Sequence, residues 1–458
     1  MRTGKALHIT LVVMIALFLI GHFLLNNKKI QQDAALHVVR IAQSALKTDV
    51  SAGRVQLTYP FGMSIEDLTV YDLRHDTLAH AASVSLRLKP FQLLRRKVSI
   101  TSVRVNTPSI RLYTDSLGAE PNYAFLTALM GGGDKPMTLR ANSVLVRNGS
   151  LRYDQRSAAR TDSLFNPDHI GISGFTANIS LKALSKDSVN LIVRKLVLTE
   201  QSGFRLTKTR GTVTIGREFT QLSGLMIATP GSQFTANRLT AQVGMASGIH
   251  GLPAVNMDVK ATVTGSDFKA LVPRTAYMTD PIDITVKGLT ESNKITLNAL
   301  YINAPRNLLD MGMSGTVLVD TAMNVTGCRF AEVHGSFSDE LPQWIEQQFA
   351  GFPVTVPAQC MSLGMGTFKG SLDSHDGILE SSAEIKSRIG TLLAVLNGQD
   401  SLYDASLEAI GVDLGTITGN RSLGKCSLTA EAQVRKDGRS YSGDFNSLIS
   451  SLTYNNYN

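Results

Sequence analysis

The chain has 458 residues, of which 43% are hydrophobic and 18% are charged. This composition excludes disorder as the general state, because disordered chains are poorer in apolar and richer in charged residues. Lys and Arg total 45 against 37 Asp and Glu. That excess is too diffuse to indicate nucleic-acid binding. The three cysteines, Cys328, Cys360 and Cys426, lie far apart, which supports neither a disulfide framework nor a thiolate metal site.

An apolar run near the N-terminus predicts a membrane anchor. Residues Leu7 to Leu25 contain no Asp, Glu, Lys or Arg, and a helix of this length spans roughly 28 Å, enough to cross a bilayer core. We therefore predict a single-pass anchor over residues 1–27. A cleaved signal peptide is the alternative, but the run is longer than a usual signal core and no A-x-A-like site follows it.

Apolar residues at helical spacing predict one helix from Lys28 to Lys47. From about Arg54 onward the period changes to two, as in Val84–Lys89, Val255–Lys260 and Ile282–Lys287. This alternation is typical of strands with one buried and one solvated face. Turn signals separate the strands, so we expect roughly 20 strands in antiparallel meanders.

Few helices interrupt the predicted strands. We expect short helices at Pro121–Met130, which a run of three glycines (Gly131–Gly133) ends, and at Asp339–Phe349. These two features give the predicted segments: the anchor 1–27, an N-terminal segment 28–130 with the capping helix and first strands, a β-groove 131–338, and its continuation 339–458.

So many amphipathic strands present a large apolar face, and almost no helix is available to cover it. One solution is a long sheet curled into an open trough that holds lipid, because an exposed apolar lining must bind something apolar. The other is a pair of conventional β-sandwiches, each filling its own core. Periodicity does not decide between the two.

The chain resembles AsmA-like proteins, and more closely the TamB-like family, the inner-membrane component of the translocation and assembly module. The resemblance lies in the order of an anchor, a short helix and a series of degenerate β patterns. The segments that carry it are Gly53–Val55, Ile65–Asp72, Ala82–Lys97, Ile100–Leu112, Asn122–Leu126, Leu196–Phe204 and Ser387–Leu392.

This resemblance implies an elongated, taco-like β-groove, anchored in the inner membrane, with most of the chain in the periplasm. It implies phospholipid as cargo and an outer-membrane β-barrel protein as a possible partner. TamB-like chains are far longer and end in a distinct domain that meets the barrel; this sequence stops at Asn458 without one. The resemblance therefore suggests a truncated or split version.

The expected function is non-enzymatic phospholipid transfer between the inner and outer membranes. The lipid-lining candidates are Val84, Leu86, Leu88, Val103, Val105, Val255, Met257, Val259, Ile282, Ile284 and Val286. The alternative is a scaffold for outer-membrane β-barrel proteins that acts through exposed strand edges by β-augmentation.

Chemical motifs are weak. The sequence has no GxSxG, HExxH or phosphate-binding loop. Asp373, His375 and Asp376 are spaced like metal ligands, but a turn ending in Gly377 favours a solvated turn. We predict no catalytic residues, no metal and no cofactor.

Overall fold

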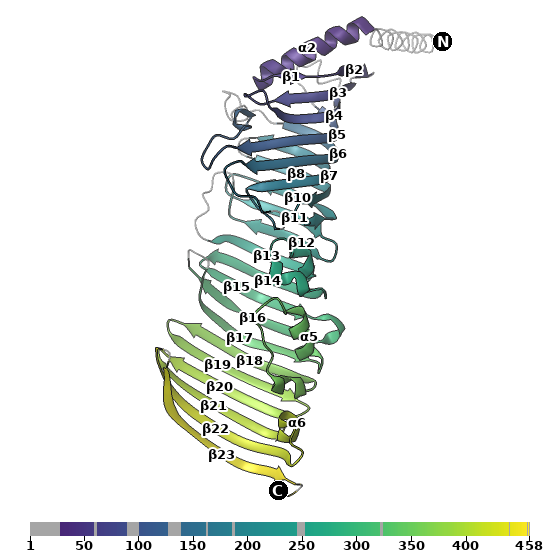
Figure 1. Ribbon diagram of the computed structural model, residues 1–458. Helices are drawn as coiled ribbons and strands as arrows, with labels where there is room; N and C mark the ends of the chain where they lie inside the picture. The colour runs from purple at the N-terminus through teal and green to yellow at the C-terminus, as the bar shows by residue number, and fades with distance from the viewer. Residues whose placement is uncertain are drawn as a thin grey trace, which may run out of the picture. The chain divides into compact units, whose positions relative to one another are not determined.

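The computed structural model describes residues 28–58, 62–88, 100–126, 139–161, 164–185, 188–244, 252–320, 324–438, 440–455 and 457. Within these ranges the chain is mostly β, with 23 strands and a few short helices (Figure 1). The predicted anchor, residues 1–27, lies outside the described residues. Among the helices in these ranges, none is both long and apolar enough to span a bilayer.

The chain divides into two compact units, residues 1–216 and 217–458. The first contains α2 (Lys28–Leu46), β1 (Val50–Ser51), β2 (Arg54–Thr58), β3 (Gly62–Tyr71), β4 (Thr77–Leu88), β5 (Ile100–Thr114), β6 (Leu139–Gln155), β7 (His169–Ser185), β8 (Ser188–Glu200), β9 (Arg205–Leu206) and β10 (Lys208–Ile215). The segment boundaries predicted at residues 130 and 338 stay predictions.

The second unit contains thirteen strands and the larger share of the short helices. Its strands are β11 (Thr220–Ala228), β12 (Gln233–Ala241), β13 (Leu252–Val263), β14 (Ile282–Ser292), β15 (Lys294–Asn303), β16 (Leu309–Val319), β17 (Val325–Phe337), β18 (Gly366–His375), β19 (Ile378–Ser387), β20 (Gly390–Gln399), β21 (Leu402–Asp413), β22 (Leu423–Asp437) and β23 (Ser440–Tyr454). Its helices are η1 (Gly265–Phe268), η2 (Pro273–Tyr277), η3 (Pro305–Asn307), α5 (Leu341–Gln348), η4 (Ala358–Ser362) and α6 (Leu414–Thr418).

In the first unit, β1 and β2 both pair with β3, and the sheet then runs through β4 to β8. Strands β9 and β10 both pair with β8. The predicted helix after the anchor is confirmed as α2, which lies beside the β1–β2 edge, where the Gln43 side chain donates to the Val50 carbonyl at 3.1 Å.

The expectation of purely antiparallel pairing is wrong at one place. Strands β5 and β6 run parallel over their whole length, with Val105 opposite Val146. A parallel pair needs a crossover of a dozen or more residues, and the 24 residues between the end of β5 and the start of β6 are enough for one. Period-two patterning cannot reveal this exception, because side chains alternate in the same way in both kinds of pair.

In the second unit, every strand from β11 to β23 pairs antiparallel with the next, as the meander prediction requires. All six helical elements lie in connections at the same ends of the strands (Figure 1). The predicted helix at Asp339–Phe349 is confirmed as α5.

Helix α5 supplies the apolar core at the helical rim of this unit. Trp344, which is 5% exposed, packs with Ala304 and Leu308, and Ile282 and Leu309 from two strands pack against this cluster. The Trp344 indole N–H donates to the Asp280 carboxylate at 2.9 Å. The helices therefore anchor one rim of the sheet without spreading across it.

The predicted taco-like curl is wrong: the sheet is neither closed nor strongly curled in either unit. Bulges and glycine kinks concentrate the bending that rolls a sheet. In the second unit, β18 pairs with β19, and β19 with β20, over ten consecutive residues without any register shift. Those strands have no local kink around which to fold over, so they stay open.

Candidate functional site

The strand register of the second unit aligns apolar residues into rows that cross the whole sheet. Residues directly opposite one another in paired strands point to the same face, so a row can be followed from strand to strand. One row crosses all thirteen strands without a polar residue. Its members, from β11 to β23, are Ile227, Phe234, Ala261, Ile284, Ile302, Met311, Gly335, Phe368, Ile385, Leu392, Ala409, Leu428 and Ile449.

A second row on the same face is apolar up to its last member. It comprises Leu225, Ala236, Val259, Val286, Leu300, Met313, Val333, Gly370, Ala383, Ala394, Leu407, Ala430 and Ser447. At about 4.8 Å per strand spacing, each row extends for roughly 58 Å. Gly335 contributes no side chain to the first row, but the Phe368 ring fills this place: it lies 2.6 Å from the position that a Cβ atom on Gly335 would take. The apolar surface is therefore continuous.

The first unit has the same arrangement. One row consists of Val55, Ile65, Val84, Val105, Val146, Ala177 and Leu196. Beside it runs a row of Leu57, Met63, Leu86, Val103, Val144, Ile179, Val193 and Gly211. The parallel pair β5–β6 does not interrupt either row.

The opposite face of each sheet is mainly polar, although Leu145, Leu393 and Leu448 lie on it. In the first unit one row contains Ser64, Ser85 and Arg104. In the second unit a row contains Thr235, Lys260, Thr285 and Tyr301. Each unit is therefore a two-faced sheet whose chemistry differs sharply between its sides.

Most members of the apolar rows are half-buried rather than buried. Within the described residues, helices cover the apolar face only at the helical rim of the second unit. There α5 packs on Ile282 and Leu309, and the Phe268 ring of η1 packs edge-on against Phe234, with the ring centroids 6.1 Å apart. A contiguous half-exposed apolar surface of this extent is unusual in a soluble monomer and indicates a binding surface.

The structure places the sequence-predicted lining residues on these faces. Val84, Leu86, Val103 and Val105 lie in the rows of the first unit. In the second unit, the register of β13 and β14 puts Val255, Met257, Val259, Ile282, Ile284 and Val286 on one face. The backbone of Leu88 pairs with Ile100, and its side chain lies outside the described residues. Contact of these residues with lipid stays a prediction.

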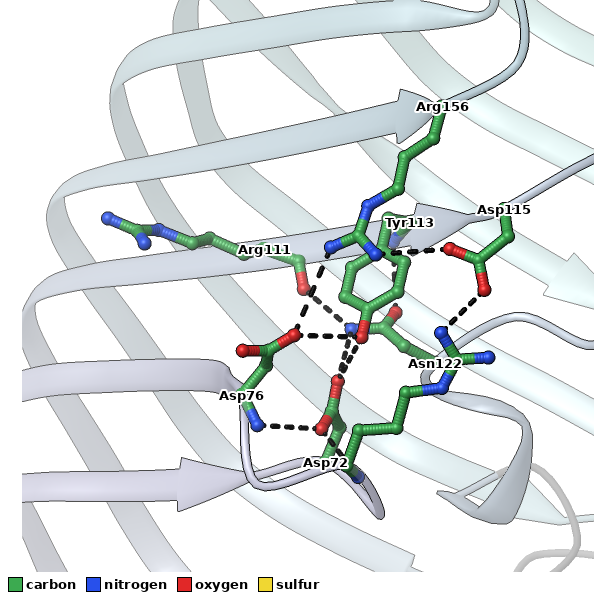
Figure 2. A network of polar contacts seen from close by, with 8 residues as sticks. Asp72, Asp76, Arg111, Tyr113, Asp115, Asn122 and Arg156 are labelled. Atoms are coloured by element: carbon green, nitrogen blue, oxygen red, sulfur yellow. Dashed lines mark hydrogen bonds and ion pairs between the residues drawn. The ribbon is translucent and has the colours of Figure 1, made fainter.

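A second candidate site is a polar cluster at one rim of the first unit (Figure 2). Asp72, which is 2% exposed, lies in the β3–β4 turn and accepts backbone N–H groups from Arg74 and Asp76, both at 2.9 Å. Its other carboxylate oxygen accepts the Tyr113 hydroxyl of β5 at 2.8 Å. Asn122, just after β5, accepts the Tyr113 N–H at 2.9 Å and donates to the Arg111 carbonyl at 3.1 Å.

Arginines complete this cluster, which we call the Asp72 clasp. The Arg156 guanidinium lies 3.6 Å from the centre of the Tyr113 ring and pairs with Asp115 at 3.0 Å. Arg74 pairs with the same carboxylate. Figure 2 shows the Arg156 guanidinium over the Tyr113 ring and directed toward Asp115. The clasp thus joins the β3–β4 turn to the C-terminal ends of β5 and β6.

Hydrogen bonding sets the ionisation of the clasp. Burial acts to raise the pKa of Asp72, but the bonds from Tyr113, Arg74, Asp76 and Asn122 outweigh it, so the pKa is lowered. Burial, together with the bond to Asp72, raises the pKa of Tyr113 to about 12. Both carboxylate oxygens of Asp72 and the Tyr113 hydroxyl have hydrogen-bond partners within the clasp, and the adjoining pocket of about 130 Å³ is smaller than the roughly 300 Å³ typical of ligand sites. The clasp is therefore structural.

The polar face of the second unit has a hollow of about 670 Å³ near Tyr301, His334, Lys369 and Lys386. Glu384 accepts from Lys369 at 2.6 Å and from Lys386 at 2.7 Å, and these bonds lower the pKa of Glu384. The lining also contains Asp310, so its two lysines are balanced by two carboxylates and the hollow offers no net positive charge to an anionic ligand.

The remaining sequence candidates behave as turn residues. Asp373 bonds to His375 at 2.8 Å and pairs with Arg329 across the β17–β18 register, and Asp376 takes a positive φ of 46° in the turn before Gly377. Within the described ranges, no group of three or more His, Cys, Asp or Glu residues is arranged to hold a metal ion.

Sequence reasoning missed the Asp72 clasp, although Asp72 and Asp76 flank a turn and Tyr113 follows an alternating strand. Pairing distant polar residues requires the strand register, which the sequence does not specify.

Comparisons with models of known protein families, with curated proteins and with solved structures found no match for this chain.

Proposed function

We propose that this protein is a non-enzymatic phospholipid carrier whose apolar faces bind acyl chains during transfer between the inner and outer membranes. The observation that supports it is the row from Ile227 to Ile449, which crosses thirteen strands without a polar side chain. Its extent, roughly 58 Å, exceeds the ~30 Å hydrocarbon thickness of a bilayer.

The energetics favour acyl chains as the ligand. Each methylene removed from water contributes ~0.8 kcal/mol, so a chain of about 15 methylenes costs on the order of 12 kcal/mol to expose. A continuous apolar row offsets much of this cost at every position along its length. Because the row has no polar recognition groups, it favours movement along the sheet over tight binding at one place.

The membrane location is part of the same proposal. Residues 1–27 act as a single-pass anchor in the inner membrane, and the bulk of the chain lies in the periplasm. The apolar run from Leu7 to Leu25 supports this placement.

Charged substitutions in the rows test the proposal. Ile284→Asp and Met257→Asp each place a carboxylate on the apolar face, where an unpaired charge is costly next to hydrocarbon. The matched control is Thr285→Asp, which puts the same charge on the polar face of the same strand. Phospholipid extracted from purified full-length protein is quantified by mass spectrometry.

We expect less phospholipid per protein in both apolar-face variants and wild-type amounts in Thr285→Asp. Lipid bound around the predicted anchor contributes equally to all variants, so the difference reports on the sheet. Circular dichroism checks that strand content is kept. Unchanged lipid in folded Ile284→Asp and Met257→Asp would show that the apolar face is not the lipid site.

The second candidate function is a scaffold for outer-membrane β-barrel proteins that pairs client strands with an exposed edge. One observation favours it: β23 is 15 residues long, and most of its residues are exposed. A long strand with exposed residues is a template for strand addition by a client. Crosslinks from β23 to a barrel client, with no loss of function in lipid-binding variants, distinguish this function from lipid transfer.

A further inference from the structure

The net positive charge of the chain belongs to its first unit. Residues 1–216 contain 28 Lys and Arg against 14 Asp and Glu, whereas residues 217–458 contain 17 against 23. The first unit therefore has a formal net charge of +14 and the second unit one of −6. A charge asymmetry of this kind points to a basic interaction surface in one part of the chain.

The imbalance is greatest in strands β4 to β10 of the first unit. These strands contain twelve Lys and Arg but only two acidic residues, Asp154 and Glu200. Asp154 pairs with Arg152 and Arg160, and Glu200 accepts the Ser202 N–H at 2.7 Å. Both carboxylates are therefore engaged locally and do not neutralise the cations elsewhere on these strands.

The register places four of these cations on the polar side of the sheet. Each lies on the face opposite the apolar rows, and the residues directly opposite each cation in the paired strands are uncharged. These opposite residues include Ser85, Ser102, Asn106 and Asn178. The four cations, which we call the basic face, are Arg87 of β4, Arg104 of β5, Arg147 of β6 and Lys195 of β8.

The three arginines of the basic face are close together. Arg104 lies at a diagonal position to Arg87 on one side and to Arg147 on the other, so their Cα atoms are about 7–8 Å apart. All four side chains of the basic face are exposed, and none forms an ion pair with another described residue. Like charges so close repel one another, and an anionic surface that covers them relieves this repulsion.

We infer that the basic face docks on the anionic phospholipid headgroups of the membrane that holds the anchor. This inference rests on the proposed membrane location: an anchor over residues 1–27 keeps the first unit near the bilayer, because β1 begins at Val50. Each Lys or Arg close to an anionic bilayer strengthens binding roughly fivefold. The second unit, whose net charge is negative, gains nothing at such a surface.

Two other anionic partners fit the basic face less well. Single-stranded nucleic acid binds through aromatic side chains on which the bases stack, and the rows of the basic face contain no aromatic residue. An acidic protein surface such as the second unit of another copy mixes 17 cations with its 23 acids. Docking by the polar side also leaves the apolar face uncovered, so headgroups and acyl chains use opposite faces of the sheet.

Photo-crosslinking of full-length protein tests the docking. Benzoylphenylalanine is placed at Ser102, which lies opposite Arg87, or at Thr285 on the polar face of the second unit as a control. The protein is reconstituted in vesicles of phosphatidylcholine, alone or mixed with phosphatidylglycerol, irradiated, and analysed by intact-protein mass spectrometry. We expect phosphatidylglycerol adducts at Ser102 that decrease at high salt, and none at Thr285.

Neutral variants show whether the cations cause the docking. Arg104→Gln with Arg147→Gln should lower the yield of Ser102 adducts by up to about 25-fold, at roughly fivefold per cation. Arg104→Lys with Arg147→Lys keeps both charges and should keep the adducts. The matched control, Lys260→Gln with Lys287→Gln, removes two exposed cations from the polar face of the second unit and should leave the yield unchanged.

Flotation separates this inference from the proposed membrane location. Protein that an alkaline wash removes from phosphatidylcholine vesicles is not anchored, which would contradict the proposed location. Anchored protein whose Ser102 adducts are absent, or are equal in the two kinds of vesicle, overturns the docking alone. Adducts to a second copy of the chain instead of lipid would assign the basic face to an acidic protein surface and would also overturn the inference.

Discussion

The two rims that stabilise the units differ in chemistry. In the first unit, the Asp72 clasp joins strand ends through a buried carboxylate and its hydrogen-bond donors. In the second unit, α5 secures a rim by apolar packing around Trp344, with one hydrogen bond from its indole to Asp280. The first arrangement is directional and sensitive to charge, and the second depends mainly on buried area.

The comparison shows that a sheet with one apolar and one polar face can be stabilised at its strand ends while its apolar face stays largely uncovered. Both rims concentrate buried groups at strand ends: Asp72 and Tyr113 in one unit, Leu308 and Trp344 in the other. Away from the rim, the apolar rows of each unit are mostly half-buried and, apart from Ser447, contain no polar side chain. Substitutions at either rim should therefore lower the stability of that rim without altering the apolar faces. Three substitutions test whether the two rims are stabilised independently.

The largest effect is expected at Trp344. Trp344→Ala removes a buried side chain and the bond to Asp280, and such truncations cost about 3–5 kcal/mol. Hydrogen exchange of α5 and the start of β16 should accelerate accordingly, with no change in the amides of the first unit. Trp344→Phe, which keeps most of the packing, should show a smaller acceleration. Equal acceleration in both units would contradict the idea of separate rims.

Asp72→Ala should have the next largest effect. It leaves the Tyr113 hydroxyl and the N–H groups of Arg74 and Asp76 without their acceptor, and loss of a buried charged acceptor costs about 3 kcal/mol. Hydrogen exchange should accelerate in the β3–β4 turn and at the end of β5. The matched control, Asp115→Ala, removes two exposed ion pairs, with Arg74 and Arg156, and should accelerate exchange much less, because exposed ion pairs contribute little to stability. A larger effect for the control would assign the clasp to its surface arginines.

How much of this could be read from the sequence depends on the range of the interactions. Alternation in segments such as Val255–Lys260 predicted strands and their apolar faces, because side-chain direction follows from position along the strand alone. The helices α2 and α5 followed from local spacing in the same way. These features need no knowledge of neighbours.

Features that depend on contacts between distant parts of the chain could not be predicted from the sequence. The parallel pair β5–β6, the absence of strong curling and the Asp72 clasp all depend on which strands meet and in what register. Tyr113, for example, lies 41 residues from Asp72, and nothing local indicates that they bond. Periodicity predicted that Ile284 faces the apolar side, but only the register shows that twelve other strands continue its row.

The smallest effect, and the sharpest in its pH dependence, is expected for Tyr113→Phe. The variant keeps the ring beneath Arg156 and loses the hydroxyl that donates to Asp72, at a cost of about 1.5 kcal/mol near neutral pH. Since the pKa of Tyr113 is raised from 10.0 to about 12 in the folded protein, its proton stabilises the fold fully below pH 10. That stabilisation is lost as the pH rises through about 12.

Ultraviolet titration of tyrosine ionisation measures this directly. The wild type should show one tyrosine that ionises near pH 12 and is missing from Tyr113→Phe, and the stability difference between the two proteins should shrink between pH 10 and 12. At the acid end, the lowered pKa of Asp72 makes its contribution present above about pH 4 and lost as the pH falls through the folded value. If Tyr113 ionised near pH 10, the hydroxyl would be exposed to water, and the clasp would hold the rim through its arginines instead.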